Sequence, residues 1–371
     1  MTSKKPVSKR KTSKAPASGR QAAGPRSGKA ASKRAAPKKP GAKDLPPDLP
    51  HPDRDDATEA AGDFDTASEA TARGEDARER PDAFHAGYIA ICGLPNAGKS
   101  TLLNTILQER LAIVTSKPQT TRRKTLGIVN VPGGQAIFID TPGILVPRDE
   151  LHAAMMRLVE ESIADADLLL YVVDVRRPEI APGVIAAAAR KPVVVAINKA
   201  DLLAVPEESL PVIERLQAEL PEAEFFVVSA LHGAGVPLLR DRLIEKLPAG
   251  APFYPADMLT EQPERFFVTE LIREALFDQF RQEIPYSSEI EITAFREQEG
   301  RKDLIEAEIF VETESQKGIL IGKGGQAIRD LGRRARASIE ELLDREVYLA
   351  LRVRVLPHWR RDPKALRRFG Y

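Results

Sequence analysis

Residues 93–100 constrain the fold of this 371-residue chain more than any other segment. They read Gly-Leu-Pro-Asn-Ala-Gly-Lys-Ser and fit the phosphate-binding pattern G-x-x-x-x-G-K-[ST]. An apolar run, residues 88–92, precedes them, and residues 101–107 follow with apolar side chains at helical spacing. This order of strand, loop and helix turns backbone N–H groups and a helix N-terminus toward a phosphate chain. The sequence therefore predicts an α/β P-loop domain.

The residue types in this loop match that chemistry. Gly93 and Gly98 permit the backbone turns and close approach that a Cβ would obstruct. Lys99 supplies a positive charge to the β- and γ-phosphates, and the Ser100 hydroxyl can bind Mg²⁺. The further predicted nucleotide contacts of the loop are Leu94, Pro95, Asn96, Ala97 and Thr101.

Charge is strongly segregated along the chain, although the formal net charge is only +1. Residues 1–43 carry fourteen Lys and Arg and no acidic residue, whereas residues 44–82 carry thirteen Asp and Glu against four Arg. Both stretches almost lack large apolar groups, so burial cannot offset their ordering entropy. We expect residues 1–82 to form a disordered charged tail.

The basic block of this tail has two readings. It is an arm that binds RNA or another acidic surface, or it is a solvated tail that associates with the acidic block. A transit peptide is disfavoured because no Leu, Ile or Phe precedes Leu45. The single cysteine, Cys92, and the absence of a membrane-length apolar stretch favour a soluble, cytoplasmic protein.

Apolar runs alternate with helical segments after residue 84. They predict a mostly parallel sheet with helices on both faces. Because ligands of such sheets bind at the carboxyl ends of the strands, the motifs that follow the strands are informative. The apolar runs are residues 135–139, 168–173, 193–197 and 225–228, and the motifs are residues 140–143, 198–201 and 229–231.

The motif after residue 139 suits the phosphates. Asp140 can hold Mg²⁺ through water, and the backbone N–H of Gly143 can meet a γ-phosphate. We also expect Thr141, Pro142 and Ile144 to contact the nucleotide.

The two later motifs suit a guanine base. The Asp201 carboxylate can accept from the paired N1–H and N2–H₂ donors of guanine, a pattern that adenine does not present. Asn198, Lys199 and Ala200 would brace the base and the loop, and a backbone N–H from Ser229, Ala230 or Leu231 can meet the guanine oxygen. Together the motifs predict a GTP or GDP ligand with Mg²⁺.

A loop with a threonine pair, residues 117–124, precedes the second strand. A threonine there can bind Mg²⁺ only when a γ-phosphate is present, which would make the loop a switch. We favour Thr121 over Thr120, so that Ser100, Thr121 and Asp140 form the predicted metal set. The alternative is a basic surface loop.

Position 144 suggests how hydrolysis proceeds. A water-orienting Gln is often expected there, but this chain has Ile144, so intrinsic hydrolysis should be slow. Our hypothesis is that a monovalent cation, K⁺, lies beside the phosphates and is held by Asn96; the alternative is a purely structural asparagine. The catalytic set is then Lys99, Thr121, Gly143 and Asn96.

The pattern changes after residue 250. A helix over 265–281, strands over 289–295 and 304–311, a glycine loop, a second helix and a strand over 347–355 indicate a KH module, which clamps about four nucleotides. In its Gly-x-x-Gly loop, Gly322 and Gly325 let the sugar–phosphate backbone approach, and Lys323 can meet a phosphate. The predicted RNA contacts are Ile319, Ile321, Gly322, Lys323, Gly324 and Gly325.

From about His85 to Tyr371 the chain resembles the Era family of bacterial ribosome-assembly GTPases. The motifs PNAGKSTLLN, PQTTRR, DTPGI, NKAD, VSAL and IGKGG stand in that family's order. The resemblance implies a TrmE–Era-type G domain over residues 83–250, a linker over 251–264 and a type II KH domain over 265–371. It also implies binding to the 3′ region of 16S rRNA in rRNA processing and 30S subunit assembly, with RNA binding controlled by the nucleotide state. A monomer and peripheral association with the inner face of the cell membrane are further expectations.

Two other classes of protein remain in view. One is a tandem-G-domain assembly GTPase or a tRNA-modification GTPase, but no second P-loop pattern is present and the G domain is not inserted in a helical domain. The other is an RNA-binding scaffold that uses GTP only as a conformational ligand.

Overall fold

The computed structural model describes residues 84–115, 117 and 119–371. All of them belong to one compact unit of the chain, Glu75–Tyr371. The predicted charged tail, residues 1–82, lies outside the described residues, so both readings of its basic block stay predictions.

The first half of the described chain forms a six-stranded sheet in the order β2-β3-β1-β4-β5-β6. Only β2 runs antiparallel to its neighbour; the other pairings are parallel. The central strands are buried along their length because helices cover both faces, which explains their continuous apolar sequences. The strands are β1 (His85–Cys92), β2 (Thr125–Val131), β3 (Gly134–Asp140), β4 (Leu168–Asp174), β5 (Val193–Asn198) and β6 (Glu224–Val227).

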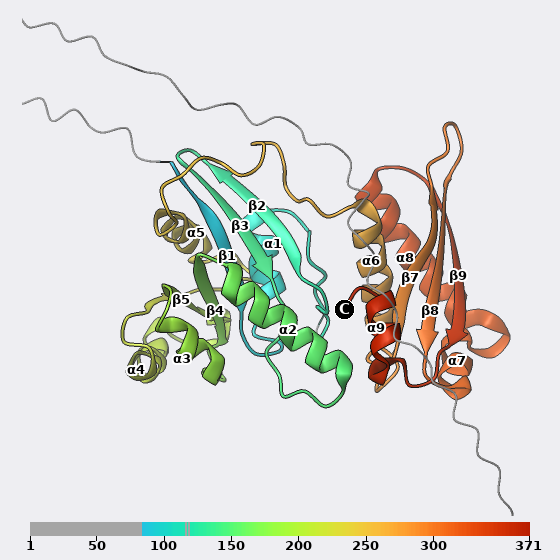
Figure 1. The fold of residues 1–371 in the computed structure, drawn as a ribbon, viewed down its shortest axis with the longest axis horizontal. Coiled ribbons are helices and arrows are strands. Elements are labelled where there is room, and N and C mark those ends of the chain that lie inside the picture. The colour runs from blue at the N-terminus through green and yellow to red at the C-terminus, as the bar shows by residue number, and fades with distance from the viewer. Residues whose placement is uncertain (1–83, 116, 118) are drawn as a thin grey trace, which may run out of the picture. The chain divides into compact units, whose positions relative to one another are not determined.

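Helices pack on both faces of this sheet (Figure 1). Helices α1 and α5 cover one face through side chains such as Leu102 and Leu239. Helices α2, α3 and α4 cover the other around Val159, Val184 and Leu216. The predicted α/β class is confirmed. The bounds are α1 (Lys99–Leu107), α2 (Glu150–Asp165), α3 (Pro182–Ala188), α4 (Leu210–Glu219) and α5 (Val236–Glu245).

Cys92, the last residue of β1, belongs to the core. Its side chain is fully buried, and burial raises the pKa of its thiol to about 12. Since the thiolate is the reactive form, Cys92 is a packing residue.

The predicted linker, residues 251–264, is bound to the sheet rather than extended in solvent. Ile128 of β2 donates its backbone N–H to Leu259 O over 2.8 Å, and Thr260 Oγ1 donates to Leu126 O over 2.7 Å. These bonds cover the edge of β2, which would otherwise present unpaired backbone groups. Glu264, the last residue of the predicted linker, is already the first residue of the next helix.

The second half of the described chain follows the order helix, two strands, two helices, strand. The sheet order is β7-β8-β9, with β7 antiparallel and β9 parallel to β8. This is the predicted type II KH arrangement, and a short helix, α9, follows it. The elements are α6 (Glu264–Gln279), β7 (Glu289–Arg296), β8 (Asp303–Val311), α7 (Glu314–Ile321), α8 (Gln326–Leu343), β9 (Val347–Val355) and α9 (Pro363–Arg368).

Helix α6 differs from its prediction. We expected an amphipathic helix over 265–281, but its polar Glu270, Arg273 and Glu274 are buried as well as its apolar face. The reason is that these three side chains take part in ion pairs. A pattern of polar residues at helical spacing cannot distinguish that arrangement from a solvated face.

None of the helices in the part of the chain that the structure describes is long and apolar enough to cross a membrane.

Candidate nucleotide site and nucleic-acid groove

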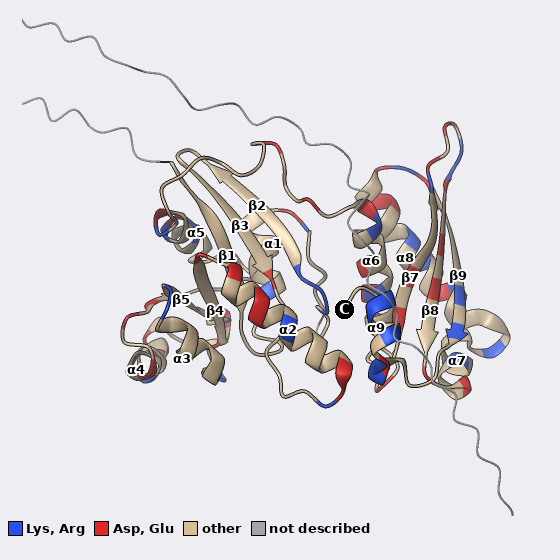
Figure 2. Cartoon of the chain, in the orientation of Figure 1, with Lys and Arg blue, Asp and Glu red and all other residues tan. Residues whose placement is uncertain are grey.

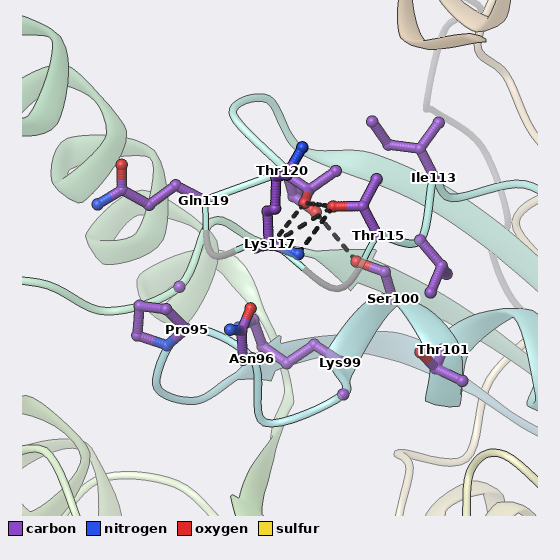
Figure 3. A pocket seen from close by; sticks show the side chains of 14 residues that line it. Pro95, Asn96, Lys99, Ser100, Thr101, Ile113, Thr115, Lys117, Gln119 and Thr120 are labelled. Carbon is purple, nitrogen blue, oxygen red and sulfur yellow. Dashed lines mark hydrogen bonds between the residues drawn. The ribbon is translucent and has the colours of Figure 1, made fainter. Parts of the chain in front are cut away.

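Four predicted nucleotide motifs lie at the carboxyl edge of the first sheet. The P-loop follows β1, Asp140 ends β3, Asn198 ends β5, and Ser229 lies just beyond β6. A cavity at this edge is lined by the P-loop, by the loop before β2 and by Gly143 (Figure 3). Parallel strands thus bring together motifs that are spread over more than 130 residues of sequence.

The P-loop is shaped for an anion. Gly98 has φ of 94°, and a Cβ there would lie 2.2 Å from Asn198 Nδ2, so the position requires glycine. Lys99 is buried, and its ammonium donates to the carbonyl oxygens of Gly93 and Leu94 over 3.2 and 3.1 Å. Burial lowers the pKa of Lys99, which a bound phosphate would counteract.

Three oxygen-bearing side chains converge beside Lys99. Ser100 Oγ donates to Asp140 Oδ2 over 2.6 Å and lies 3.0 Å from Thr121 Oγ1. Burial raises the pKa of Asp140 to about 6, against the opposing effect of its hydrogen bond from Ser100. The other carboxylate oxygen, Asp140 Oδ1, is buried without a hydrogen-bond partner.

This set suits Mg²⁺. The ion prefers oxygen ligands at about 2.1 Å in octahedral geometry, so neighbouring ligand oxygens lie about 3 Å apart. The separation of Ser100 Oγ and Thr121 Oγ1 matches that spacing. No group of three or more His, Cys, Asp and Glu side chains gathers among the described residues.

The two threonines of the loop before β2 are separated by the structure. Thr120 is buried; its hydroxyl lies 2.6 Å from that of Thr115 and donates to Lys117 O over 2.9 Å. The Thr121 hydroxyl instead meets Ser100. The geometry therefore favours the sequence choice of Thr121.

The base side of the site is braced by Asn198. Its Nδ2 donates to Ala97 O in the P-loop over 2.9 Å, and its Oδ1 accepts from the Ala230 N–H over 2.9 Å. Ser229 Oγ donates to Asp201 Oδ1 over 2.6 Å, which orients the exposed carboxylate. The predicted base-side residues therefore lie together.

Sequence reasoning missed Asp174, the last residue of β4. Its carboxylate lies 2.7 Å from Lys199 Nζ and holds the lysine stem in place. The sequence feature that could have identified Asp174 is its position directly after the apolar run 168–173, at the same sheet edge as the motifs.

Gln119 and Ile144 complete the phosphate side. Gln119 lines the cavity, with φ of 62°, and its Oε1 lies 3.4 Å from His152 Nε2. The Ile144 side chain packs on the sheet core, and its backbone N–H donates to Gly93 O over 3.0 Å. The backbone of Ile144 thus holds the segment after β3 against the start of the P-loop.

Asn96 also lines the cavity, but its backbone conformation is informative. Its φ is 65°, in the left-handed region that Asn tolerates better than most residues. Both readings of Asn96, cation ligand and structural residue, fit this geometry.

The glycine loop of the second half joins α7 to α8. At Gly322 a Cβ would lie 2.7 Å from that of Ala327, so the tight turn requires glycine. Lys323 is exposed at the tip, and Gly324 and Gly325 both have positive φ. The loop presents backbone and one cation to solvent, as phosphate contact requires.

An open groove runs beside this loop, between α8 and β9. Its apolar floor consists of Ile328, Leu349 and Leu351, and a row of arginines borders it. These arginines are Arg329, Arg333 and Arg336. Basic residues also occur along β9 and α9 (Figure 2). An apolar floor can receive the bases while the arginines meet the phosphates, which suits the single strands that KH modules bind.

Ile319 and Ile321, two of the predicted RNA contacts, lie on α7 just before the glycine loop. Two positions apart on α7, they point to nearly opposite sides of the helix, and Ile319 is 48% exposed. Neither is among the described residues that line the groove between α8 and β9, and the same is true of Gly322 and Lys323, so their contact with RNA stays a prediction.

Comparisons with known proteins agree with this geometry. The family model of 50S ribosome-binding GTPases matches residues 88–199, and the KH domain model matches residues 283–360. GTPase Era of Syntrophus aciditrophicus is 44% identical over 294 residues, spanning 78% of this chain and 95% of that protein. GTPase Era of Geotalea uraniireducens is 44% identical over 292 residues, spanning 78% and 98%.

The chain belongs to the Era family of GTPases.

Solved structures of Era proteins are also similar to this chain. One is an Aquifex aeolicus Era variant bound to GDP and AlF₄⁻, with TM-score 0.73 and 38% identity over 77% of this chain and 99% of that one. Another is Era in complex with MgGDPNP and nucleotides 1506–1542 of 16S ribosomal RNA, with TM-score 0.74 and 38% identity over 78% and 99%. As an Era family member, the protein hydrolyses GTP to GDP and phosphate.

Proposed function

We propose that this Era GTPase binds the 3′ region of 16S rRNA through its KH groove, and that its nucleotide state controls that binding in rRNA processing and 30S subunit assembly. The groove between α8 and β9, beside the Gly322–Gly325 loop, carries the proposal. The similar Era complex that contains both MgGDPNP and a 16S rRNA segment supports it, since both ligands are present at once.

The same proposal assigns the nucleotide site. Lys99 binds the β- and γ-phosphates, and the backbone N–H groups of the P-loop and Gly143 bind their oxygens. Asp201 accepts from guanine, while Asn198 and Lys199 hold the base loop in place. We assign these roles to a G domain over 83–250, with the linker at 251–264 and the KH domain at 265–371.

The Mg²⁺ set of this proposal is Ser100, Thr121 and Asp140. When bound, Mg²⁺ supplies positive charge to the transferring phosphoryl group. Ser100 and Thr121 present hydroxyl oxygens at one face of the cavity, and Asp140 orients Ser100 by accepting a hydrogen bond from its hydroxyl. Thr121 belongs to the loop before β2, so its position reports whether a γ-phosphate is present.

Positioning of the attacking water requires another group, because Ile144 packs on the core. We propose that K⁺, held by Asn96, supplies charge there. The position of Asn96 in the lining of the phosphate cavity supports this role.

We further propose a monomeric, cytoplasmic protein that associates peripherally with the inner face of the membrane.

Binding of single-stranded RNA tests the KH assignment. The variant that combines Lys323→Asp and Gly325→Asp adds two negative charges at the loop and strains a residue whose φ is 77°. We expect it to bind a single-stranded 16S 3′ RNA at least about tenfold more weakly, with unchanged affinity for GDP. Lys302→Asp is the matched control, since Lys302 is exposed and pairs with Glu346 away from the groove. Equal RNA affinity of the double variant and wild type would contradict the assignment.

A further inference from the structure

The loop that lines the phosphate cavity is also held by the second half of the molecule. Arg122, the residue after Thr121, is only 2% exposed. Its Nη1 donates to Ser288 O over 2.8 Å and to Glu289 Oε2 over 3.0 Å, and its Nη2 donates to Pro285 O and Tyr286 O over 2.8 and 3.0 Å. One guanidinium thus binds four acceptors at the turn that leads into β7.

Glu289 is the centre of this contact. Its side chain is fully buried and accepts from Arg122, from Arg273 Nη2 over 2.6 Å and from Tyr371 Oη over 2.8 Å. Arg123 Nη2 lies 3.7 Å from Glu289 Oε1. We call Arg122, Arg123, Arg273 and Glu289 the arginine clasp.

The clasp fixes geometry. A buried ion pair adds little stability over an apolar pair of similar volume, because the charges must be desolvated. Its hydrogen bonds are directional, however, and few arrangements satisfy all of them. Two of its arginines belong to the loop before β2, and the third belongs to α6. The clasp therefore determines where the loop lies relative to α6 and β7.

Further bonds hold the loop's earlier part to α6. The ammonium of Lys117, which lines the phosphate cavity, donates to Phe280 O over 2.5 Å and also to Phe277 O. Arg110 pairs with Glu274 over 2.6 Å. The end of α6 in turn reaches the glycine loop, because Gln279 Nε2 donates to Ala327 O over 2.7 Å and Ala327 packs against Gly322.

The consequence for the metal site follows from chain connectivity. Arg122 and Thr121 are adjacent, so fixing the guanidinium limits where the Thr121 hydroxyl can lie. In the clasped structure that hydroxyl is already 3.0 Å from Ser100 Oγ, the spacing that two ligands of one Mg²⁺ need. A GDP complex has no γ-phosphate, so it does not need the Thr121 hydroxyl as a ligand of Mg²⁺. The clasp therefore favours binding of the triphosphate over binding of GDP.

We propose that Glu289 is a positioning residue that, through Arg122, holds Thr121 in the triphosphate-binding arrangement, so that the KH domain sets the preference for GTP over GDP. The proposal rests on the function proposed above for Thr121. It makes the KH domain an internal activator of the switch loop, and by reciprocity the bound triphosphate holds the KH domain in the clasped arrangement.

Nucleotide affinities of the full chain test this proposal. Dissociation constants for GDP and for GDPNP, a GTP analogue that is not hydrolysed, are measured with Mg²⁺ for wild type, Arg122→Gln and Glu289→Gln. We expect both variants to bind GDPNP about tenfold more weakly, the weight of one or two charge-assisted hydrogen bonds, and GDP within about twofold of wild type. The matched control is Glu291→Gln on the same strand, whose partner is the exposed Arg368; it should leave both affinities unchanged.

A double-mutant cycle separates positioning from simple destabilisation. Once Thr121→Ala has removed the hydroxyl, Glu289→Gln should cost no further GDPNP affinity. Equal weakening of GDP and GDPNP, no weakening of either, or additive effects in the cycle would overturn the proposal. If Glu289→Gln loses its thermal transition, Arg122→Gln decides, because it leaves the Glu289–Arg273 pair in place. Failure of the wild type to bind any guanine nucleotide would instead overturn the proposed function.

Discussion

Asn198 donates its side-chain N–H to the carbonyl oxygen of Ala97 over 2.9 Å, 101 residues earlier in the chain. The same amide accepts from the backbone N–H of Ala230. One buried side chain therefore joins the P-loop to the two segments that we predict to bind the base. The phosphate and base halves of the site are built as one rigid edge.

Asn198→Ala should cost both stability and nucleotide affinity. It leaves the Ala97 carbonyl and the Ala230 N–H buried without partners, at about 2–4 kcal/mol in the free energy of unfolding. GDP and GDPNP affinities should fall equally because both ligands use the P-loop. Urea unfolding measures the first effect. Gln326→Ala, which removes only exposed side-chain bonds to Asp330 and Arg329, is the control that should cost less than about 1 kcal/mol. An Asn198→Ala protein as stable as this control would contradict the assignment.

Asp201→Asn should change base specificity. In the proposed site the exposed carboxylate accepts from two guanine donors. An amide cannot accept from both, whereas it can donate to the C2 oxygen of xanthine. GTP affinity should fall about 100-fold or more and xanthosine triphosphate affinity should rise. Competition against a fluorescent guanine nucleotide measures both, and a variant that keeps its guanine preference would exclude Asp201 as the base-reading residue.

Asn96→Gly distinguishes the two readings of that position. Glycine keeps the left-handed backbone that Asn96 adopts, with φ of 65°, but removes the side-chain oxygen. If Asn96 holds K⁺, turnover in KCl should fall about tenfold to the level in NaCl. Stimulation by KCl that survives in Asn96→Gly would identify a structural asparagine.

Much of the nucleotide site could be predicted because a parallel sheet fixes where strand ends lie. Asp140, Asn198 and Ser229 each follow an apolar run, and the fold brings those ends together. Strand sequences buried on both faces are easy to identify, so the positions of the strand ends along the chain could be predicted, whereas the order of the strands in the sheet was not.

The contacts between the two halves of the chain were not predictable. Arg122 lies in a run of basic residues that reads as a solvated loop, yet it is buried against Glu289, 167 residues away. Nothing local in either segment indicates the partner. The same holds for Leu349 and Leu351, whose alternation in β9 marks a strand face but not which ligand groove it borders.

Glu289 also predicts a pH dependence of stability. Burial alone would raise the pKa of its carboxyl, but the charges of Arg273 and Arg122 outweigh burial and lower it to about 2 from an ordinary value of 4.5. A lowered pKa contributes stability that is present above pH 4.5 and lost as pH falls toward 2, about 3 kcal/mol in all. Urea unfolding from pH 6 to pH 3 should show the gap between wild type and Glu289→Gln narrowing. The reason is that the carboxyl of the unfolded wild type becomes protonated below pH 4.5, whereas the folded carboxyl, with its pKa of about 2, stays charged. A gap that stays constant with pH would contradict the ion pairing.

The central claim is that nucleotide state controls RNA binding, and one titration tests it most directly. A labelled single-stranded RNA with the sequence of the 16S 3′ region is titrated with the full chain and Mg²⁺, once with saturating GDPNP and once with saturating GDP. The account predicts that the RNA dissociation constant is about tenfold lower with GDPNP, because the triphosphate and the clasped KH domain stabilise each other. Equal RNA affinity in the two nucleotide states, in a protein that binds both nucleotides, would contradict it.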